Sequence, residues 1–241
     1  MTQVSDQVLL DLAPSGKLRF AINFGNPVLV QRDPSGQPKG ITVDLAKELS
    51  LRLGVTPEFV SYDAAGKVFA AIADGAWDVA FLARDPVRAE QILFTPPYVV
   101  IEGSYLVGAE SSFQHIDDLD QPGVRIAVGQ GAAYDLYLTR ALKHATLVRF
   151  DTSAGAIELF QSEGLNAAAG VRQPLQEAAD ARPGLRVIPG RFTSIEQAMG
   201  TLAGREAGHQ FLVDFIAEMK ASGFVAAALL RHGEKTAQVA P

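Results

Sequence analysis

The strongest constraint on the fold of this chain is its alternation of short β-rich runs with segments of helical periodicity. Runs at 18–22, 78–83 and 124–128 are rich in apolar residues, and helical patterns follow them. This alternation is typical of βα units, whose strands form a largely parallel sheet. Two such series, separated by an extended stretch at 99–107, predict an α/β fold with two lobes rather than one continuous sheet.

Local signals place further elements. Asp85-Pro86 predicts a helix start, because Asp is a good N-cap and Pro is tolerated at the first helical position, so Arg88 falls in the first turn. Trp77 precedes a strand and is expected in the core. The remaining predicted elements are helices at 45–53 (ending at Gly54), 67–73, 132–142, 154–163, 174–181 and 204–230 (broken at 222–223) and strands at 58–60, 147–150, 166–169 and 185–188.

Composition excludes several classes of function. A chain of 241 residues that is 48% hydrophobic can bury a core and forms one large or two small domains. With 21 Lys+Arg against 27 Asp+Glu it offers no basic face, so we predict no nucleic-acid binding. The absence of cysteine removes disulfides and thiolate chemistry. Its four histidines are scattered, and we predict no metal site, no cofactor and no catalytic residue.

The N-terminal segment lacks the features of a signal peptide. Residues 1–12 have no basic region and carry acids within their apolar part. No stretch approaches the roughly 18 uninterrupted apolar residues of a membrane span. If Met1 is the native start, this predicts a cytoplasmic protein.

The segment 124–134, VRIAVGQGAAY, imitates a dinucleotide-binding turn, with Asp151 further along the chain. Tyr134 stands where the third small residue belongs, which would obstruct close packing of helix on strand, so we do not predict NAD binding. Two readings stay open. The amides of 129–133 hold a carboxylate or hydroxyl at a helix N-terminus, or the glycines serve only the shape of the turn.

Arginines follow strands in both series. Arg84 and Arg88 lie just past the run at 78–83, where ligands of open α/β sheets bind, and a guanidinium there suits a carboxylate. Arg172 and Gln173 follow the strand at 166–169 in the same way. On spacing alone, an arginine early in a surface helix is more often a solvated side chain, and the loop with Arg172 and Gln173 can equally be exposed to water.

Several motifs occur in a familiar order. GITVDLAKEL at 40–49, AIADGAWD at 71–78, DPVRA at 85–89, FTPPY at 94–98 and GVRIAVGQGAAY at 123–134 resemble the family 3 extracellular solute-binding proteins, the polar-amino-acid receptors of ABC transporters. The resemblance covers about residues 16–233. It implies a two-lobed, type II periplasmic-binding fold, with a ligand cleft between lobes that close by hinge motion.

The resemblance also implies how the chain is divided. Lobe 1 would comprise 1–98 plus 198–241, and lobe 2 would comprise 104–192. The crossovers would lie at 98–103 and 193–197, with Glu102 and Gln197 as hinge residues.

Site residues follow from the same resemblance. Arg88 falls on the family's carboxylate-binding arginine. The other positions on ligand-contacting stretches are Asn23, Asn26, Ala64, Ala65, Phe81, Ala83, Gln130, Gly131, Ala132, Ala133, Gly170 and Arg172.

The chain departs from the family pattern at three places. Ala64-Ala65 stands where an aromatic usually stacks on the ligand, and Ala83 replaces a hydroxyl residue. Gly170-Val171-Arg172 stands where an acid pairs with the ligand's ammonium. A buried ammonium without a carboxylate is destabilised by several kcal/mol, so an ordinary α-amino acid requires Glu102 or another acid as a substitute.

The resulting hypothesis is a non-enzymatic, monomeric solute-binding protein for a small anionic or amino-acid-like ligand, with an ABC permease as partner and a periplasmic location implied by the resemblance. Two alternatives stay open. One is an enzyme resembling cyclohexadienyl dehydratase, which needs a general acid, and the other is a cytoplasmic ligand sensor.

Overall fold

The computed structural model describes residues 4–241, which form two compact units. Unit 1 comprises the described residues up to 62 together with 67–100 and 196–241, and unit 2 comprises 63–66 and 101–195. Two long strands, β7 (Val99–Gly108) and β12 (Thr193–Leu202), each contain residues of both units. The segment 63–66 therefore packs with unit 2, although the chain on either side of it belongs to unit 1.

The sheet of unit 1 is built on β1, which pairs in parallel with β4 on one side and β5 on the other. The last part of β12 then pairs antiparallel with β5, with Gln197 opposite Ala83 and Thr201 opposite Val79. Strand β6 pairs with β12, β13 pairs with the first residues of β7, and β2 and β3 form a separate hairpin. The strands are β1 (Lys17–Asn23), β2 (Gln31–Arg32), β3 (Pro38–Lys39), β4 (Thr56–Tyr62), β5 (Val79–Ala83), β6 (Ile92–Phe94) and β13 (Gln238–Val239).

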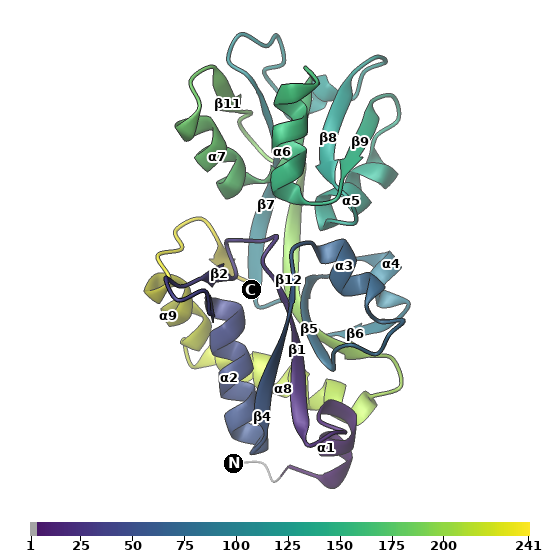
Figure 1. Ribbon diagram of the computed structural model, residues 1–241, viewed down its shortest axis with the longest axis vertical. Coiled ribbons are helices and arrows are strands. Elements are labelled where there is room, and N and C mark those ends of the chain that lie inside the picture. Colours follow the sequence, from purple (N-terminus) through teal and green to yellow (C-terminus); the bar gives the residue numbers. More distant parts are fainter. Residues whose placement is uncertain (1–3) are drawn as a thin grey trace. The chain divides into compact units, whose positions relative to one another are not determined.

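Two helix boundaries predicted in unit 1 are confirmed by the residues that stand there. The Asp85 side chain accepts a hydrogen bond from the Val87 amide at 2.9 Å, which confirms the helix start predicted there. Gly223, with φ of 77°, separates the last two helices and confirms the predicted break. The helices are α1 (Asp6–Leu12), α2 (Ile41–Leu53), α3 (Ala65–Ala70), α4 (Pro86–Ala89), α8 (Glu206–Ala221) and α9 (Phe224–Arg231) (Figure 1).

The strands of unit 2 follow the hydrogen-bonded order β7-β10-β8-β9 and belong to a single sheet of eleven strands, so the prediction that the sheet would not be continuous is wrong. Strand β8 is parallel to β9 and to β10, whereas β10 and β11 pair antiparallel with β7. Helix α6 packs on β8, β9 and β10, and α7 packs on β10 and β11. The elements are β8 (Arg125–Gly129), β9 (Thr146–Phe150), β10 (Ala167–Val171), β11 (Leu185–Val187), η1 (Ile116–Leu119), α5 (Ala133–Ala141), α6 (Ser153–Ser162) and α7 (Arg172–Ala181).

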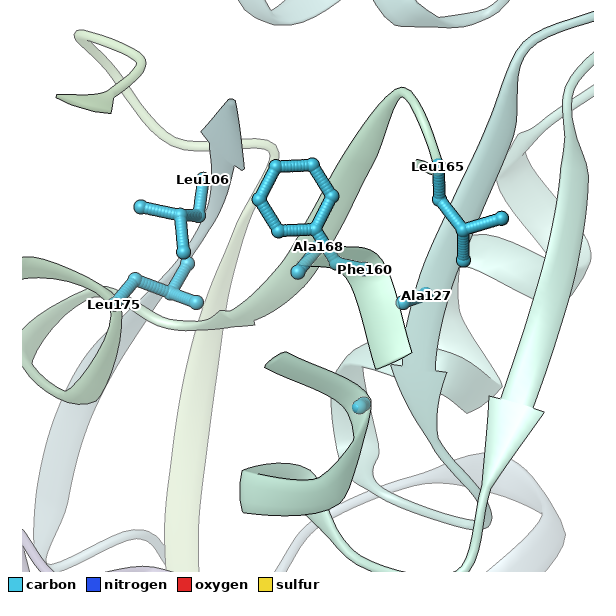
Figure 2. Packing of buried hydrophobic residues seen from close by; sticks show 7 residues of the cluster. Leu106, Ala127, Phe160, Leu165, Ala168 and Leu175 are labelled. Atoms are coloured by element: carbon cyan, nitrogen blue, oxygen red, sulfur yellow. The ribbon is translucent and has the colours of Figure 1, made fainter. Parts of the chain in front are cut away.

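Apolar side chains from the strands and from α6 and α7 form the core of unit 2. Figure 2 shows the ring of Phe160 between Leu106 and Leu165, with Leu175 close to Leu106. All four side chains are at most 5% exposed. Burying them stabilises the unit by roughly 1.5–3 kcal/mol each. Strands β8 and β10 contribute Ala127 and Ala168 to this core, and candidate site residues follow both strands.

The predicted α/β alternation is confirmed, with β1, β4 and β5 parallel in one unit and β8, β9 and β10 in the other. The predicted burial of Trp77 is also confirmed: it is 1% exposed, and its Nε1 donates to the Val68 carbonyl at 2.9 Å. Helix α1 and strands β2, β3, β6, β12 and β13 were not predicted as elements. No helix within residues 4–241 combines the length and apolar character needed to cross a membrane.

Candidate functional site

Arg88 is the most unusual charged residue of unit 1. It lies in α4, directly after β5, and is 1% exposed. Its Nη1 donates to the Ala83 carbonyl at 2.9 Å. Burial lowers the pKa of the guanidinium to about 10, and the charge of Asp85 opposes this shift. The fold therefore holds a cation in an environment that disfavours its charge.

A buried cation of this kind is suited to recognising an anion. Removing a charged group from water is costly unless an opposite charge or hydrogen bonds compensate for it. A carboxylate can accept two parallel N–H donors of a guanidinium, so a buried arginine is a candidate for carboxylate recognition. Arg84, in contrast, is half exposed and pairs with Glu196 at 3.0 Å, as a surface arginine does.

Other predicted residues of unit 1 lie at the same edge of its sheet. Since β1 and β5 are parallel, with Ala21 opposite Ala80, Asn23 and Ala83 end their strands at one edge, next to α4. The Asn23 side chain accepts a hydrogen bond from the Gly25 amide at 3.0 Å. Asn26 follows in the same loop, and its buried Oδ1 makes no hydrogen bond with any residue of 4–241.

Phe81 on β5 and Gln197 on β12 are both buried near this edge of the sheet. Phe81 is 4% exposed, and its ring contacts those of Phe20 and Tyr98. Gln197, which is 5% exposed, lies opposite Ala83, and its carbonyl accepts from the Tyr98 amide at 2.9 Å.

In unit 2, the turn after β8 brings Gln130 and Gly131 against the 63–66 segment. A Cβ on Gly131 would lie 2.8 Å from the Gly66 Cα, and Gly131 has φ of 69°, so both space and backbone favour glycine. The predicted residues Ala64 and Ala65 precede Gly66 and are thereby placed near this turn.

Hydrogen bonds within unit 2 engage the first amides of this turn. The Gln130 amide donates to the Phe150 carbonyl at 2.7 Å, and the Gly131 amide donates to the Asp135 carboxylate at 2.8 Å. The Ala132 amide donates to the Gly129 carbonyl at 3.1 Å. These bonds favour the reading in which the glycines serve the shape of the turn. Ligand contacts at 130–133 stay a prediction.

Tyr134 is the residue at which this segment departs from a dinucleotide-binding turn. Its buried hydroxyl donates to the Ser153 Oγ at 2.7 Å. A Cβ on Gly129 would lie 2.8 Å from that hydroxyl, so the glycine leaves room for the tyrosine.

A second group of charges in unit 2 joins residues far apart in the sequence, and we call it the Glu102 cluster. Glu102 on β7 pairs with Arg172 (Nε to Oε2, 2.8 Å) and with Arg191 (Nη1 to Oε1, 2.9 Å). The Arg172 Nη2 also donates to the Gly190 carbonyl. Hydrogen bonds from both arginines hold the pKa of Glu102 below its usual range.

Sequence reasoning singled out Glu102 and Arg172 but missed Arg191. No local signal marks Arg191, since it lies 89 residues beyond the carboxylate with which it pairs. The neighbouring Gly170 pairs with Ser104 on β7, and a Cβ there would lie 3.1 Å from the Leu175 side chain. Within residues 4–241 there is no group of His, Asp and Glu side chains suited to a metal ion.

Comparison with known proteins places this architecture in one class. The fold is that of the two-lobed type II periplasmic binding proteins. A mutant of ArgBP from T. maritima matches with a TM-score of 0.80 at 21% identity, covering 95% of this chain and 100% of that one. The solute receptor for L-cysteine of Neisseria gonorrhoeae has the same TM-score and identity, with 95% and 93% covered. The ancestral amino-acid-binding protein AncCDT-1, a precursor of cyclohexadienyl dehydratase, has a TM-score of 0.77 at 22% identity, with 92% and 97% covered.

The family follows from the sequence. The model of the bacterial extracellular solute-binding proteins, family 3, matches residues 18–235, and the chain belongs to this family. No curated protein matches the chain.

Proposed function

We propose that this protein captures a small, carboxylate-bearing, amino-acid-like solute and presents it to an ABC-type permease. Family membership supports a binding role. Proteins of known structure with this fold include one described as an amino acid ABC transporter substrate-binding protein bound to L-arginine.

Arg88 is the observation that carries the proposal. Its buried guanidinium stands at the carboxyl edge of β5, with its pKa lowered by burial. Burial disfavours the charged form of this group, and a bound carboxylate would favour it. Asn23 and Asn26, which leave the same edge, are proposed to contact the solute. Phe81 and Ala83 would supply apolar surface there.

The protonation state of Glu102 also favours a binding role over catalysis. A dehydratase requires a group that donates a proton at neutral pH. The pKa of Glu102 is lowered by its two arginines, so the carboxyl is ionised and does not serve as that acid. Incubation with prephenate or arogenate should therefore yield no aromatic product. Formation of aromatic product at a rate that depends on Glu102 would instead favour the hypothesis of an enzyme.

A thermal-shift screen tests the proposal directly. The purified protein is mixed in turn with α-amino acids, aliphatic mono- and dicarboxylates and aromatic acids. A ligand at one hundred times its Kd stabilises the folded state by about 2.7 kcal/mol and raises the melting temperature. We expect at least one carboxylate to do so in the wild type and in the Arg84→Met control, and not in Arg88→Met. Equal shifts in Arg88→Met would refute the assignment.

A further inference from the structure

A buried acid, Asp85, accompanies Arg88 at the start of α4 in unit 1. Asp85 is the N-cap residue, and Arg88 is the third residue of the helix, after Pro86 and Val87. Side chains at these two positions of a helix start are neighbours, as in a capping box. Asp85 is 8% exposed and Arg88 is 1% exposed. A negative and a positive group therefore share one poorly solvated part of unit 1.

Backbone hydrogen bonds hold both side chains in place. The Asp85 Oδ1 accepts from the Val87 amide at 2.9 Å, and the Arg88 Nη1 donates to the Ala83 carbonyl at 2.9 Å. Pro86 has no N–H group. The first two positions of the helix therefore offer no amide to an anion, and the guanidinium of Arg88 is the group that attracts one.

The negative charge of Asp85 acts on Arg88, whereas the other buried acids of unit 1 have their partners elsewhere. Burial lowers the pKa of Arg88, and the charge of Asp85 opposes this shift. The remaining buried acids that the structure describes in unit 1 accept hydrogen bonds as follows: Asp11 from Gly208, Asp78 from Arg19 and Arg205, and Glu234 from Thr236. Asp85 is thus the buried acid that compensates for Arg88.

This compensation determines which solutes the Arg88 site favours. A carboxylate bound to Arg88 adds a second negative charge near Asp85, and like charges repel strongly where water is largely excluded. A solute that also carries an ammonium group adds no net charge, and its ammonium is attracted by Asp85. Repulsion of the wrong solute is one of the two ways in which a site gains specificity.

We propose that Asp85 is a specificity-determining residue of the Arg88 site, which selects zwitterionic solutes against carboxylates that lack a positive group. The inference rests on the proposed function, in which Arg88 binds the carboxylate of the solute. It goes further by assigning the charge that the rest of the solute carries and the residue that reads this charge.

A double-mutant cycle without ligand tests the coupling of the two residues. Asn is as good an N-cap as Asp, so Asp85→Asn removes the charge and keeps the helix start. We expect Asp85→Asn to lower the urea midpoint at pH 7, because Arg88 then lacks its compensating charge. In the Arg88→Met background the same change should leave the midpoint unchanged or raise it. Equal losses in both backgrounds would overturn the inference.

Calorimetric titration then measures the selectivity with pairs of probes that differ only in the α-ammonium group. The pairs are L-alanine and propanoate, L-leucine and 4-methylpentanoate, L-glutamine and 4-carbamoylbutanoate, and L-phenylalanine and 3-phenylpropanoate. In each pair that binds, the amino acid should bind at least about tenfold more tightly, as one interaction between charged groups implies.

Variants assign this preference to Asp85. Asp85→Asn and Asp85→Ser both retain a capping side chain, and both should reduce the preference about tenfold. They should also tighten binding of the deaminated probes severalfold, a change in the direction opposite to that of a damaged site. Glu196→Gln is the matched control, because it removes a negative charge from an exposed pair with Arg84, in which both side chains are 48% exposed. Its effect should stay below about twofold.

Three outcomes of the titrations would refute the role of Asp85. These are a deaminated probe that binds the wild type as tightly as its amino acid, equal effects of Asp85→Asn and Glu196→Gln, and binding of carboxylates by a protein that binds none of the amino acids. The third outcome leaves the proposed function intact. Failure of the proposed function looks different, because Arg88→Met would then leave the binding of every carboxylate unchanged.

Discussion

Replacing Arg88 by methionine should leave the ligand-free protein at least as stable as the wild type, although the residue is fully buried. The pKa of the guanidinium falls from 12.5 to about 10 on folding, mainly because burial disfavours its charge. At about 1.4 kcal/mol per pKa unit, charged Arg88 opposes folding by roughly 3 kcal/mol at neutral pH. Since the folded-state pKa is the lower one, this penalty is complete at neutral pH and diminishes as the pH rises above about 10.

Methionine removes that penalty along with the hydrogen bond that Arg88 donates to Ala83. The bond from Nη1 to the Ala83 carbonyl, at 2.9 Å, involves a charged donor and contributes roughly 1.5–3 kcal/mol. The difference leaves Arg88→Met between about 0 and 1.5 kcal/mol more stable than the wild type. Methionine is flexible and apolar, so it can fill much of the vacated space.

Urea unfolding at pH 7 without ligand measures this difference as a change in midpoint at constant slope. Two control variants calibrate the assay. Arg84→Met removes an exposed ion pair and should change the free energy of unfolding by less than about 0.5 kcal/mol. Arg205→Met removes a partner of Asp78, a carboxylate with 0% exposed side chain, and should destabilise by about 1–3 kcal/mol. A loss above about 2 kcal/mol in Arg88→Met would show that the arginine is a structural residue and refute the reasoning.

Three further changes probe unit 2. Leu175→Ala empties a fully buried core position and should lower the free energy of unfolding by about 2–5 kcal/mol in urea, against less than about 0.5 for Leu230→Ala, whose residue is 76% exposed. Gly131→Ala combines φ of 69° with a Cβ 2.8 Å from the Gly66 Cα and should destabilise by more than about 1 kcal/mol; an unchanged melting temperature would contradict this geometry. Because the pKa of Glu102 is lowered, its stabilisation is complete above its usual pKa of 4.5 and is lost as the pH falls through the lowered value. Glu102→Gln should therefore reduce the fall in urea midpoint on acidification, and an unchanged pH profile would contradict the pairing.

The sequence predicts most of the regular structure, because the signals for it are local. Asp85-Pro86 begins a helix and Gly223 ends one through the backbone properties of the residues themselves. Strands that are apolar throughout, such as β5, are recognised by their runs of buried residues. Strand β12 was expected only as a crossover, because its partners β5 and β6 lie about a hundred residues earlier and its own pattern is interrupted by Gly200.

The candidate site was predicted less completely, because its electrostatics depend on tertiary contacts. Arg88 could be singled out from its place after β5, yet its burial could not be read from an arginine in the first turn of a short helix. Resemblance to a family raised Glu102 and Arg172 as candidates, but their direct pairing and the participation of Arg191 required the fold. Contacts of the solute with 130–133 remain predictions.

The pairing of β12 with β5 implies an order of folding. Gln197 lies opposite Ala83, so the sheet of unit 1 lacks one of its strands until residues beyond 196 leave the ribosome. Strands β7 to β11 are all present in the emerging chain before then. Closing so long a loop is entropically unfavourable and slow. During synthesis, β5 therefore presents an unpaired edge to the surrounding solution while unit 2 is made. This interval is when a chaperone would protect the nascent protein from edge-to-edge aggregation.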